Sequence, residues 1–124
     1  MILVIGGAYQ GKLDYVLEHY PGKSVFRCGA ENCDMDLSAD IIDSLHLMLL
    51  AQTHAEKDTL EYLREKLPEL KNKIIICDDI SCGVVPVDCE TRQWRENVGR
   101  GLALLSRNAD EVIRVFCGIG SRIK

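Results

Sequence analysis

The fold is decided by residues 1–12, which read MILVIGGAYQGK. Residues 1–5 are an unbroken apolar run, which is typical of a strand buried on both faces in a parallel sheet. The next apolar residues are spaced as on one face of a helix: Leu13, Val16, Leu17 and Tyr20. This stretch therefore predicts a buried strand, a glycine-rich turn and a helix in direct succession.

The turn matches the pattern G-x-x-x-x-G-K of a phosphate-binding loop, or P-loop, from Gly6 to Lys12. Its glycines allow successive N–H groups to point at phosphate oxygens, while Lys12 and the positive end of the next helix offset the phosphate charge. The residues predicted to bind the nucleotide, GTP or ATP, are Gly6, Gly7, Ala8, Tyr9, Gln10, Gly11, Lys12 and Leu13. The competing interpretation is a plain glycine-rich turn with a lysine on the surface.

One position departs from the P-loop pattern. Leu13 stands where Ser or Thr normally places a hydroxyl on Mg²⁺. Losing one ligand of a charged centre costs about 1.5–3 kcal/mol, which weakens metal-dependent chemistry without preventing phosphate binding. The sequence therefore supports nucleotide binding more strongly than catalysis.

Two carboxylates follow a second buried strand, predicted over residues 73–77. Asp78 and Asp79 come at its carboxyl end, the edge on which a phosphate loop lies in such sheets. We expect both to serve as Mg²⁺ ligands, with Lys12 and Asp79 as the catalytic residues of phosphoryl transfer. The alternative is that one of the two caps the loop over residues 80–86.

The rest of the chain alternates between the two kinds of element. A short strand is predicted over 24–28, a helix from Ser38 through Leu49, a helix over 60–67 after Asp58-x-x-Glu61, a helix over 88–108 and a strand over 111–117. Alternating strands and helices predict an α/β fold, a P-loop-containing three-layer sandwich with a mostly parallel sheet. We expect residues 1–124 to form a single nucleotide-binding domain.

Composition excludes several classes of protein. The net charge is −4 and no basic block occurs, so we expect no nucleic-acid partner. The six cysteines follow no secretory leader and include no Cys-x-x-Cys pair, so they predict a reduced, cytoplasmic protein with buried thiols rather than disulfides or zinc. The apolar runs are too short to span a membrane.

Two blocks of the sequence carry a family resemblance. The first is residues 1–8 with Gly11-Lys12, and the second extends to the end of the sequence through Gly83-Val84-Val85-Pro86, Arg92, Arg95, Gly99-Arg100, Ala109-Asp110-Glu111-Val112, Gly118-Ile119-Gly120 and Ile123-Lys124. Both resemble the bifunctional adenosylcobinamide kinase/adenosylcobinamide-phosphate guanylyltransferase family of cobalamin biosynthesis. The resemblance implies phosphorylation of adenosylcobinamide and then GMP transfer from GTP onto adenosylcobinamide phosphate, by a homo-oligomer.

The chain also departs from that family. Leu13 replaces a serine, Asp78-Asp79 replaces Asn-Glu, and the middle of the chain is shortened where the family carries its GMP-accepting histidine. No matching motif surrounds His19, His46 or His54, and we expect His46 to be a packed helix residue and the other two to lie on the surface. The arginines Arg92, Arg95 and Arg100 are expected to meet a phosphate or a neighbouring subunit, or to form an ordinary solvated face.

Three hypotheses follow from the sequence. The first is a nucleotide-binding kinase or nucleotidyltransferase of this family. The second is a catalytically degenerate paralogue that senses nucleotide or regulates a partner, which Leu13 and the missing histidine motif favour. The third is an unrelated small P-loop kinase or NTPase.

Overall fold

A computed structural model describes residues 1–80 and 88–124, so the Gly83–Pro86 part of the family resemblance, Cys82 and most of the loop over 80–86 lie outside the described residues. The described residues form one sheet with strand order β2-β3-β4-β1-β5-β6. Its strands are β1 (Ile2–Gly6), β2 (Val25–Arg27), β3 (Ile41–Asp43), β4 (Ile74–Asp78), β5 (Glu111–Phe116) and β6 (Ile119–Arg122). The pairs from β2 to β5 are parallel and β6 is antiparallel to β5, which confirms a mostly parallel sheet.

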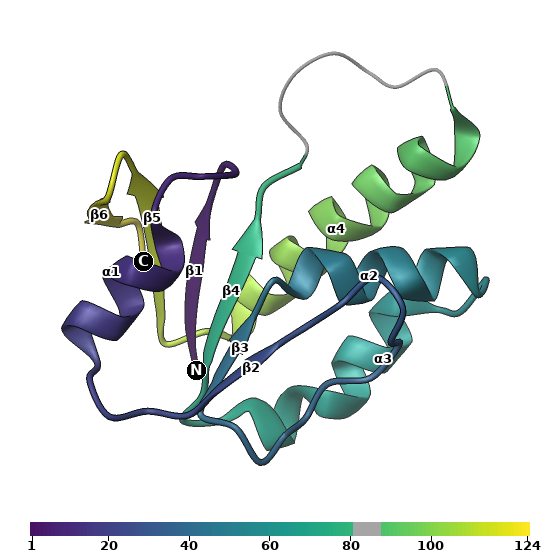
Figure 1. The fold of residues 1–124 in the computed structure, drawn as a ribbon. Helices are drawn as coiled ribbons and strands as arrows, with labels where there is room; N and C mark the ends of the chain where they lie inside the picture. Colours follow the sequence, from purple (N-terminus) through teal and green to yellow (C-terminus); the bar gives the residue numbers. More distant parts are fainter. Residues whose placement is uncertain (81–87) are drawn as a thin grey trace.

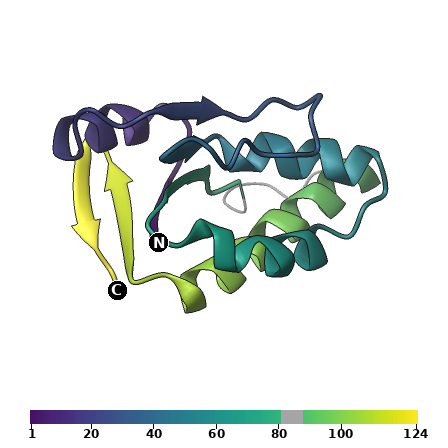
Figure 2. The ribbon, with the colours of Figure 1, turned by 90° about the horizontal axis from the view of Figure 1, so that it is seen from below.

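The helices cover both faces of this sheet (Figures 1 and 2). They are α1 (Lys12–His19), α2 (Leu45–His54), α3 (Thr59–Lys66) and α4 (Cys89–Asn108), with a short 3-10 helix, η1 (Leu67–Leu70). Helix α1 lies on one face, and α2, α3 and α4 lie on the other. The predicted three-layer α/β sandwich is therefore confirmed.

Alternation along the buried strands divides the core between the two faces. In β1, Leu3 packs in the cluster under α2, α3 and α4, whereas Val4 packs in the cluster under α1. In β4, Ile75 faces the first cluster and Ile76 the second. Because both faces of the strand are covered, its sequence is continuously apolar rather than alternating.

The helix predicted from Ser38 through Leu49 is wrong in its first half. Residues Ile41–Asp43 form strand β3, and α2 begins only at Leu45. The apolar residues fitted a helical face, but β-branched Ile41 and Ile42 are buried on opposite faces of the sheet. Ser44, with φ of 59°, separates the strand from the helix.

Strand β6 was also missed by the sequence analysis. It pairs with β5 through a two-residue turn in which Cys117 and Gly118 both have positive φ, of 51° and 76°, as in a type I′ turn. Its residues are mostly exposed, so they lack the apolar pattern that marks the other strands.

The helix starts agree with the predicted signals. The Asp58 carboxylate accepts a hydrogen bond from the Glu61 N–H at 3.1 Å, and that of Asp88 accepts one from the Thr91 N–H at 2.9 Å. Both are side-chain caps of α3 and α4. No helix in the described part of the chain is long and apolar enough to cross a bilayer.

The cysteines divide into buried and exposed groups. Cys28 and Cys77 are buried, as predicted, whereas Cys89 and Cys117 are exposed and Cys33 lies between these extremes. Burial raises the pKa of the Cys28 thiol to about 12. All five described cysteines are free thiols.

Candidate functional site

A cavity of about 590 Å³ opens at the carboxyl edge of the sheet, between the phosphate loop (residues 6–12) and the ends of β2, β3 and β4. The loop side is lined by Ala8, Tyr9, Gly11, Lys12 and Leu13. The opposite side is lined by Arg27, Asp43, Ser44, His46 and Asp78. Most of the residues predicted to bind nucleotide thus face one cavity.

Two glycines are required by the path of the phosphate loop. A Cβ atom on Gly6 would lie 2.4 Å from the Val115 carbonyl oxygen in the neighbouring strand β5. Gly11 has φ of 83°, in the left-handed region that glycine adopts without strain. A third turn residue, Tyr9, also has positive φ, of 60°, and its side chain is fully exposed.

The amide groups of the loop point to an anion site. The carbonyls of Gly6, Gly7 and Gln10 accept hydrogen bonds. Among residues 1–80 and 88–124, by contrast, no hydrogen bond has an amide N–H of residues 8–12 as its donor. Since donors at the start of a helix are normally satisfied by caps, water or ligands, these amides suit phosphate oxygens.

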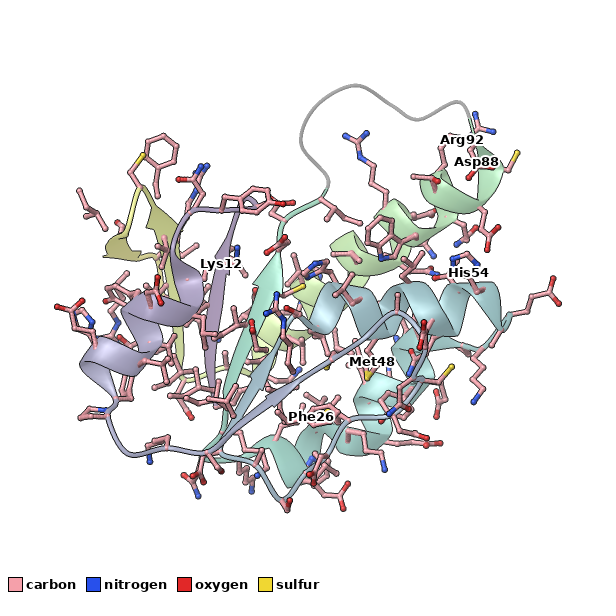
Figure 3. The ribbon with its side chains drawn as sticks, viewed as in Figure 1. Lys12, Phe26, Met48, His54, Asp88 and Arg92 are labelled. Carbon is pink, nitrogen blue, oxygen red and sulfur yellow. The ribbon has the colours of Figure 1, made fainter. Side chains whose placement is uncertain are left out.

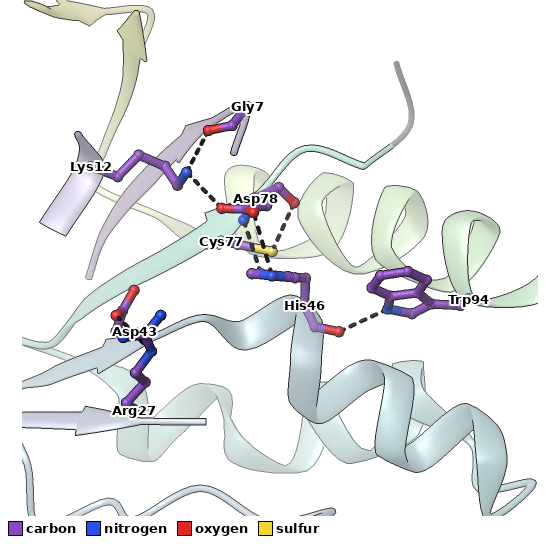
Figure 4. Close-up of polar contacts among 8 residues, drawn as sticks. All are labelled: Gly7, Lys12, Arg27, Asp43, His46, Cys77, Asp78 and Trp94. Atoms are coloured by element: carbon purple, nitrogen blue, oxygen red, sulfur yellow. Dashed lines mark hydrogen bonds and ion pairs between the residues drawn. The ribbon is translucent and has the colours of Figure 1, made fainter. Parts of the chain in front are cut away.

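Lys12 turns inward rather than into solvent, with only 7% of its surface exposed. Its Nζ donates to the Gly7 carbonyl at 2.7 Å and forms an ion pair with Asp78 Oδ1 at 2.6 Å (Figure 4). This burial contradicts the alternative of a surface lysine on a plain turn. The lysine charge is held at the floor of the cavity, between β1 and β4.

Asp78 also contacts His46, at the first turn of α2. The Asp78 N–H donates to His46 Nδ1 at 3.2 Å, and His46 Nε2 lies 3.4 Å from Asp78 Oδ2 (Figure 4). Desolvation by burial lowers the pKa of His46, and this exceeds the raising effect of the Asp78 carboxylate. His46 is a packed helix residue, as expected, but its ring also lines the cavity, which the sequence analysis did not foresee.

A further carboxylate in the cavity was missed from sequence. Asp43 ends β3, is buried, and has its Oδ2 3.9 Å from Nε of the exposed Arg27. The sequence does not predict it as a site residue, because the apolar spacing from Ile41 to Leu49 favours a helix over residues 41–43. The signal was present, since Ile41-Ile42-Asp43 is an apolar β-branched run ending in an acid, like the run that ends at Asp78.

The structure separates the two acids predicted to act together. The Asp78 carboxylate meets Lys12, whereas Asp79 lines a smaller hollow of about 150 Å³ with Gly6, Gln10 and Arg114. The Asp79 N–H donates to the Gly6 carbonyl at 2.8 Å, which fixes the end of β4 to the start of the loop. The metal-binding and catalytic roles of Asp79 stay predictions.

The donor set of the cavity suits Mg²⁺. Within the described ranges, no group of three or more His, Cys, Asp or Glu side chains forms a ready-made metal site. Mg²⁺, however, usually takes one or two carboxylates together with substrate phosphates and waters. Asp43 and Asp78 both face the cavity, so they fit an ion that arrives with a nucleotide.

The arginines of α4 lie elsewhere. Arg92 donates to Cys89 Sγ at 2.9 Å, and Arg100 pairs with Glu96 at 2.5 Å on the same helix. Figure 3 shows Arg92 and Asp88 at the start of α4, far along the molecule from Lys12. The described arginines of this helix do not line the phosphate-loop cavity. His54, at the end of α2, pairs with Glu90 and is exposed, as is His19.

A comparison with protein families gives a match. The family model described as cobinamide kinase / cobinamide phosphate guanyltransferase matches residues 30–123, which is most of the chain. No curated protein matches the chain significantly. The match includes β3, β4 and α4 and begins after the phosphate loop, so the loop assignment depends on its own motif and geometry. On this match, the chain belongs to the cobinamide kinase / cobinamide phosphate guanyltransferase family.

Proposed function

We propose that this protein binds GTP or ATP through residues 6–13 and transfers the terminal phosphoryl group to the aminopropanol hydroxyl of adenosylcobinamide. The observation that carries the proposal is the cavity itself. It combines loop amides that have no donor bond among the described residues with the buried ammonium group of Lys12. Family membership supports a nucleotide-binding kinase and guanyltransferase type of function.

The chain's own residues divide the work of such a transfer. Loop amides and Lys12 hold the phosphates and offset the charge that spreads over the transferred group. The substrate oxygen bonds to the γ-phosphorus, the bond from that phosphorus to the bridging oxygen breaks, and the nucleoside diphosphate leaves. The hydroxyl proton passes to a carboxylate, for which Asp43 is placed in the cavity.

Mg²⁺ would be held by Asp43 and Asp78, the two carboxylates that line the cavity, whereas Asp79 lines the neighbouring hollow. Bound there, the ion would neutralise charge on the β- and γ-phosphates. Leu13 contributes no hydroxyl, so we expect nucleotide binding by Leu13→Ser to depend more strongly on Mg²⁺ than binding by the wild type.

The proposal covers the kinase half of the family's reaction pair. Guanylyl transfer in this family uses a histidine, by the resemblance stated above, and the segment that carries it is shortened. Both ring nitrogens of His46 face Asp78, so neither presents a lone pair to a phosphorus atom in the cavity. We also propose a single domain over residues 1–124 and a homo-oligomer, as the family resemblance implies.

The test is calorimetric titration of GTP and ATP, with Mg²⁺, into the wild type and Lys12→Ala. Losing the buried ammonium group is expected to weaken binding about a hundredfold, or about 3 kcal/mol. Lys23→Ala is the matched control, because Lys23 is exposed and precedes β2 at the opposite edge of the sheet. Equal affinity in the two lysine variants would remove the phosphate-loop assignment.

The second candidate function is nucleotide sensing without turnover. Leu13 favours it, because it offers Mg²⁺ no hydroxyl ligand. Measuring release of nucleoside diphosphate with and without cobinamide separates the two functions. Turnover that depends on cobinamide supports the kinase, whereas tight binding without turnover supports the sensor. Hydrolysis independent of cobinamide would indicate an NTPase.

A further inference from the structure

We propose that His46 is a positioning residue, whose imidazole ring fixes the Asp78 carboxylate and through it the ammonium group of Lys12. The contact between His46 and Asp78 is present whether or not the protein transfers a phosphoryl group. Its consequence for turnover rests on the proposed function. Three groups from α1, β4 and α2 thereby act as one unit at the floor of the cavity (Figure 4).

The hydrogen bonds assign the tautomer of the ring. The Asp78 N–H is a donor, so His46 Nδ1, at 3.2 Å, must present its lone pair. In a neutral ring the proton then resides on Nε2, which faces Asp78 Oδ2 at 3.4 Å. One ring therefore contacts both the backbone and the side chain of Asp78.

The Asp78 carboxylate is consequently held at both oxygens. Oδ2 faces the imidazole and Oδ1 pairs with Lys12 at 2.6 Å. A carboxylate with both oxygens engaged cannot rotate freely, so the lysine ammonium group is also kept in place. Neighbours of this kind orient the groups that meet the substrate, and losing them typically costs 10- to 100-fold in activity.

The ring is itself firmly placed. Its side chain is 11% exposed, and the His46 carbonyl accepts a hydrogen bond from Trp94 Nε1 of α4 at 2.8 Å. The Trp94 ring also lies beside the imidazole, with centroids 6.4 Å apart. Helix α4 thus fixes the first turn of α2, and that turn fixes Asp78.

The test compares His46→Leu, which removes both ring nitrogens, with His46→Gln, whose amide can replace the Nε2–H donor. We expect the leucine variant to lose 10- to 100-fold in kcat for cobinamide-dependent turnover, with the dissociation constant for GTP changed less than threefold. The glutamine variant is expected to recover most of the loss. His54→Leu is the matched control, because His54 lies on the same helix but is exposed and outside the cavity.

A purely structural role of His46 would give another pattern: equal defects in the leucine and glutamine variants that follow their melting temperatures. Equal activity of His46→Leu and wild type would also overturn the inference.

Nuclear magnetic resonance tests the contact between His46 and Asp78 without depending on turnover. If the wild type shows no turnover, the proposed function fails, but this measurement still tests the positioning role of His46. Nitrogen-15 spectra of the nucleotide-free protein are expected to show His46 as the Nε2–H tautomer. The carbon-13 signal of the Asp78 carboxyl is expected to move in His46→Leu and to stay in place in His54→Leu. An Nδ1–H tautomer, or an unmoved Asp78 signal, would overturn the positioning role.

Discussion

The phosphate loop has two neighbours that hold it by different means. The acidic side consists of Asp43, His46 and Asp78, which come from three separate elements and act through their side chains. The hairpin side is the turn between β5 and β6, whose Cys117 and Gly118 N–H groups donate to the Gln10 side chain at 2.7 Å and the Gln10 carbonyl at 2.8 Å.

The two sides therefore differ in role: one supplies side chains to the cavity, and the other holds the loop in place. In a type I′ turn the central N–H groups are available to an outside acceptor, so the hairpin holds the loop with backbone atoms alone. The acidic side depends on particular side chains, and each of them also faces the cavity. Substitutions on the acidic side should therefore change turnover as well as stability, whereas substitutions on the hairpin side should change mainly stability.

The largest effect is expected where the loop meets the hairpin strand. Gly6→Ala places a methyl group 2.4 Å from the Val115 carbonyl, a backbone atom that cannot move without distorting β5. We expect a loss of about 3 kcal/mol in the free energy of unfolding, measured by urea denaturation.

The control for this variant is Gly99→Ala in α4, where an added methyl group meets no atom within 4 Å. Alanine is the better helix former, so that variant should gain up to about 1 kcal/mol. Equal stabilities of the two variants would show that β5 adjusts to the loop instead of fixing it.

The next effect breaks the acidic side. Asp78→Ala leaves the Lys12 ammonium group buried with the Gly7 carbonyl as its remaining partner among the contacts described. We expect a loss of about 2 kcal/mol in the free energy of unfolding. Because nucleotide phosphates replace the missing carboxylate, saturating GTP should raise the melting temperature of this variant more than that of the wild type.

The matched control for Asp78→Ala is Asp40→Ala, which removes an exposed carboxylate that contacts Ser24 away from the cavity. Its melting temperature should respond to GTP as the wild type does. An equal GTP response in Asp78→Ala would mean that phosphate does not take the place of the missing carboxylate beside Lys12.

The sequence could predict those structural features that depend on residues close together in the chain. Residues 1–12 gave both the strand and the turn, because a continuous apolar run and two glycines leave few other conformations. Asp58 and Asp88 marked the N-terminal starts of α3 and α4, and their carboxylates do cap these helices. Each of these signals lies within a few residues of its effect.

The acidic side could not be assembled in the same way. His46 and Asp78 are 32 positions apart, and the pairing of β3 with β4 in the sheet brings them together. The sequence also misled, because Ile41 and Leu45 share a helical spacing although a strand ends between them. The hairpin was missed since its turn is Cys-Gly rather than the usual Asn-Gly, and β6 is largely exposed.

A smaller effect is expected on the hairpin side. Gln10→Ala removes the side-chain acceptor of the Cys117 N–H but keeps the carbonyl that accepts from Gly118. Since the Cys117 N–H is then open to water, we expect a loss of only about 1 kcal/mol in the free energy of unfolding.

Affinity for GTP in this variant should fall no more than about fivefold, which calorimetry would measure, because the loop amides are retained. Gln93→Ala is the control, since Gln93 makes an exposed side-chain amide contact with Asn97 on the same helix, α4. A loss of GTP binding as large as that of Lys12→Ala would place the hairpin side within the binding site rather than behind it.

The smallest effect is expected in the rate of thiol modification, with one cysteine beside the acidic side and one on the hairpin side. Cys77 precedes Asp78 and is fully buried, and desolvation raises the pKa of its thiol, so little thiolate forms between pH 7 and pH 9. Cys117 is exposed at the hairpin turn. We expect iodoacetamide to modify Cys117 in the folded protein and Cys77 only after unfolding, as peptide mass spectrometry would show.

Repeating the labelling with saturating GTP tests whether nucleotide binding reaches the hairpin side. The cavity is lined by the acidic side and not by Cys117, so the rate of modification at Cys117 should change less than about twofold when nucleotide binds. Cys117→Ser identifies the reporting peptide, and exposed Cys89, at the start of α4, gives a reference rate in the same sample. Strong protection of Cys117 alone would mean that the hairpin closes over the nucleotide, which would make it a second wall of the site.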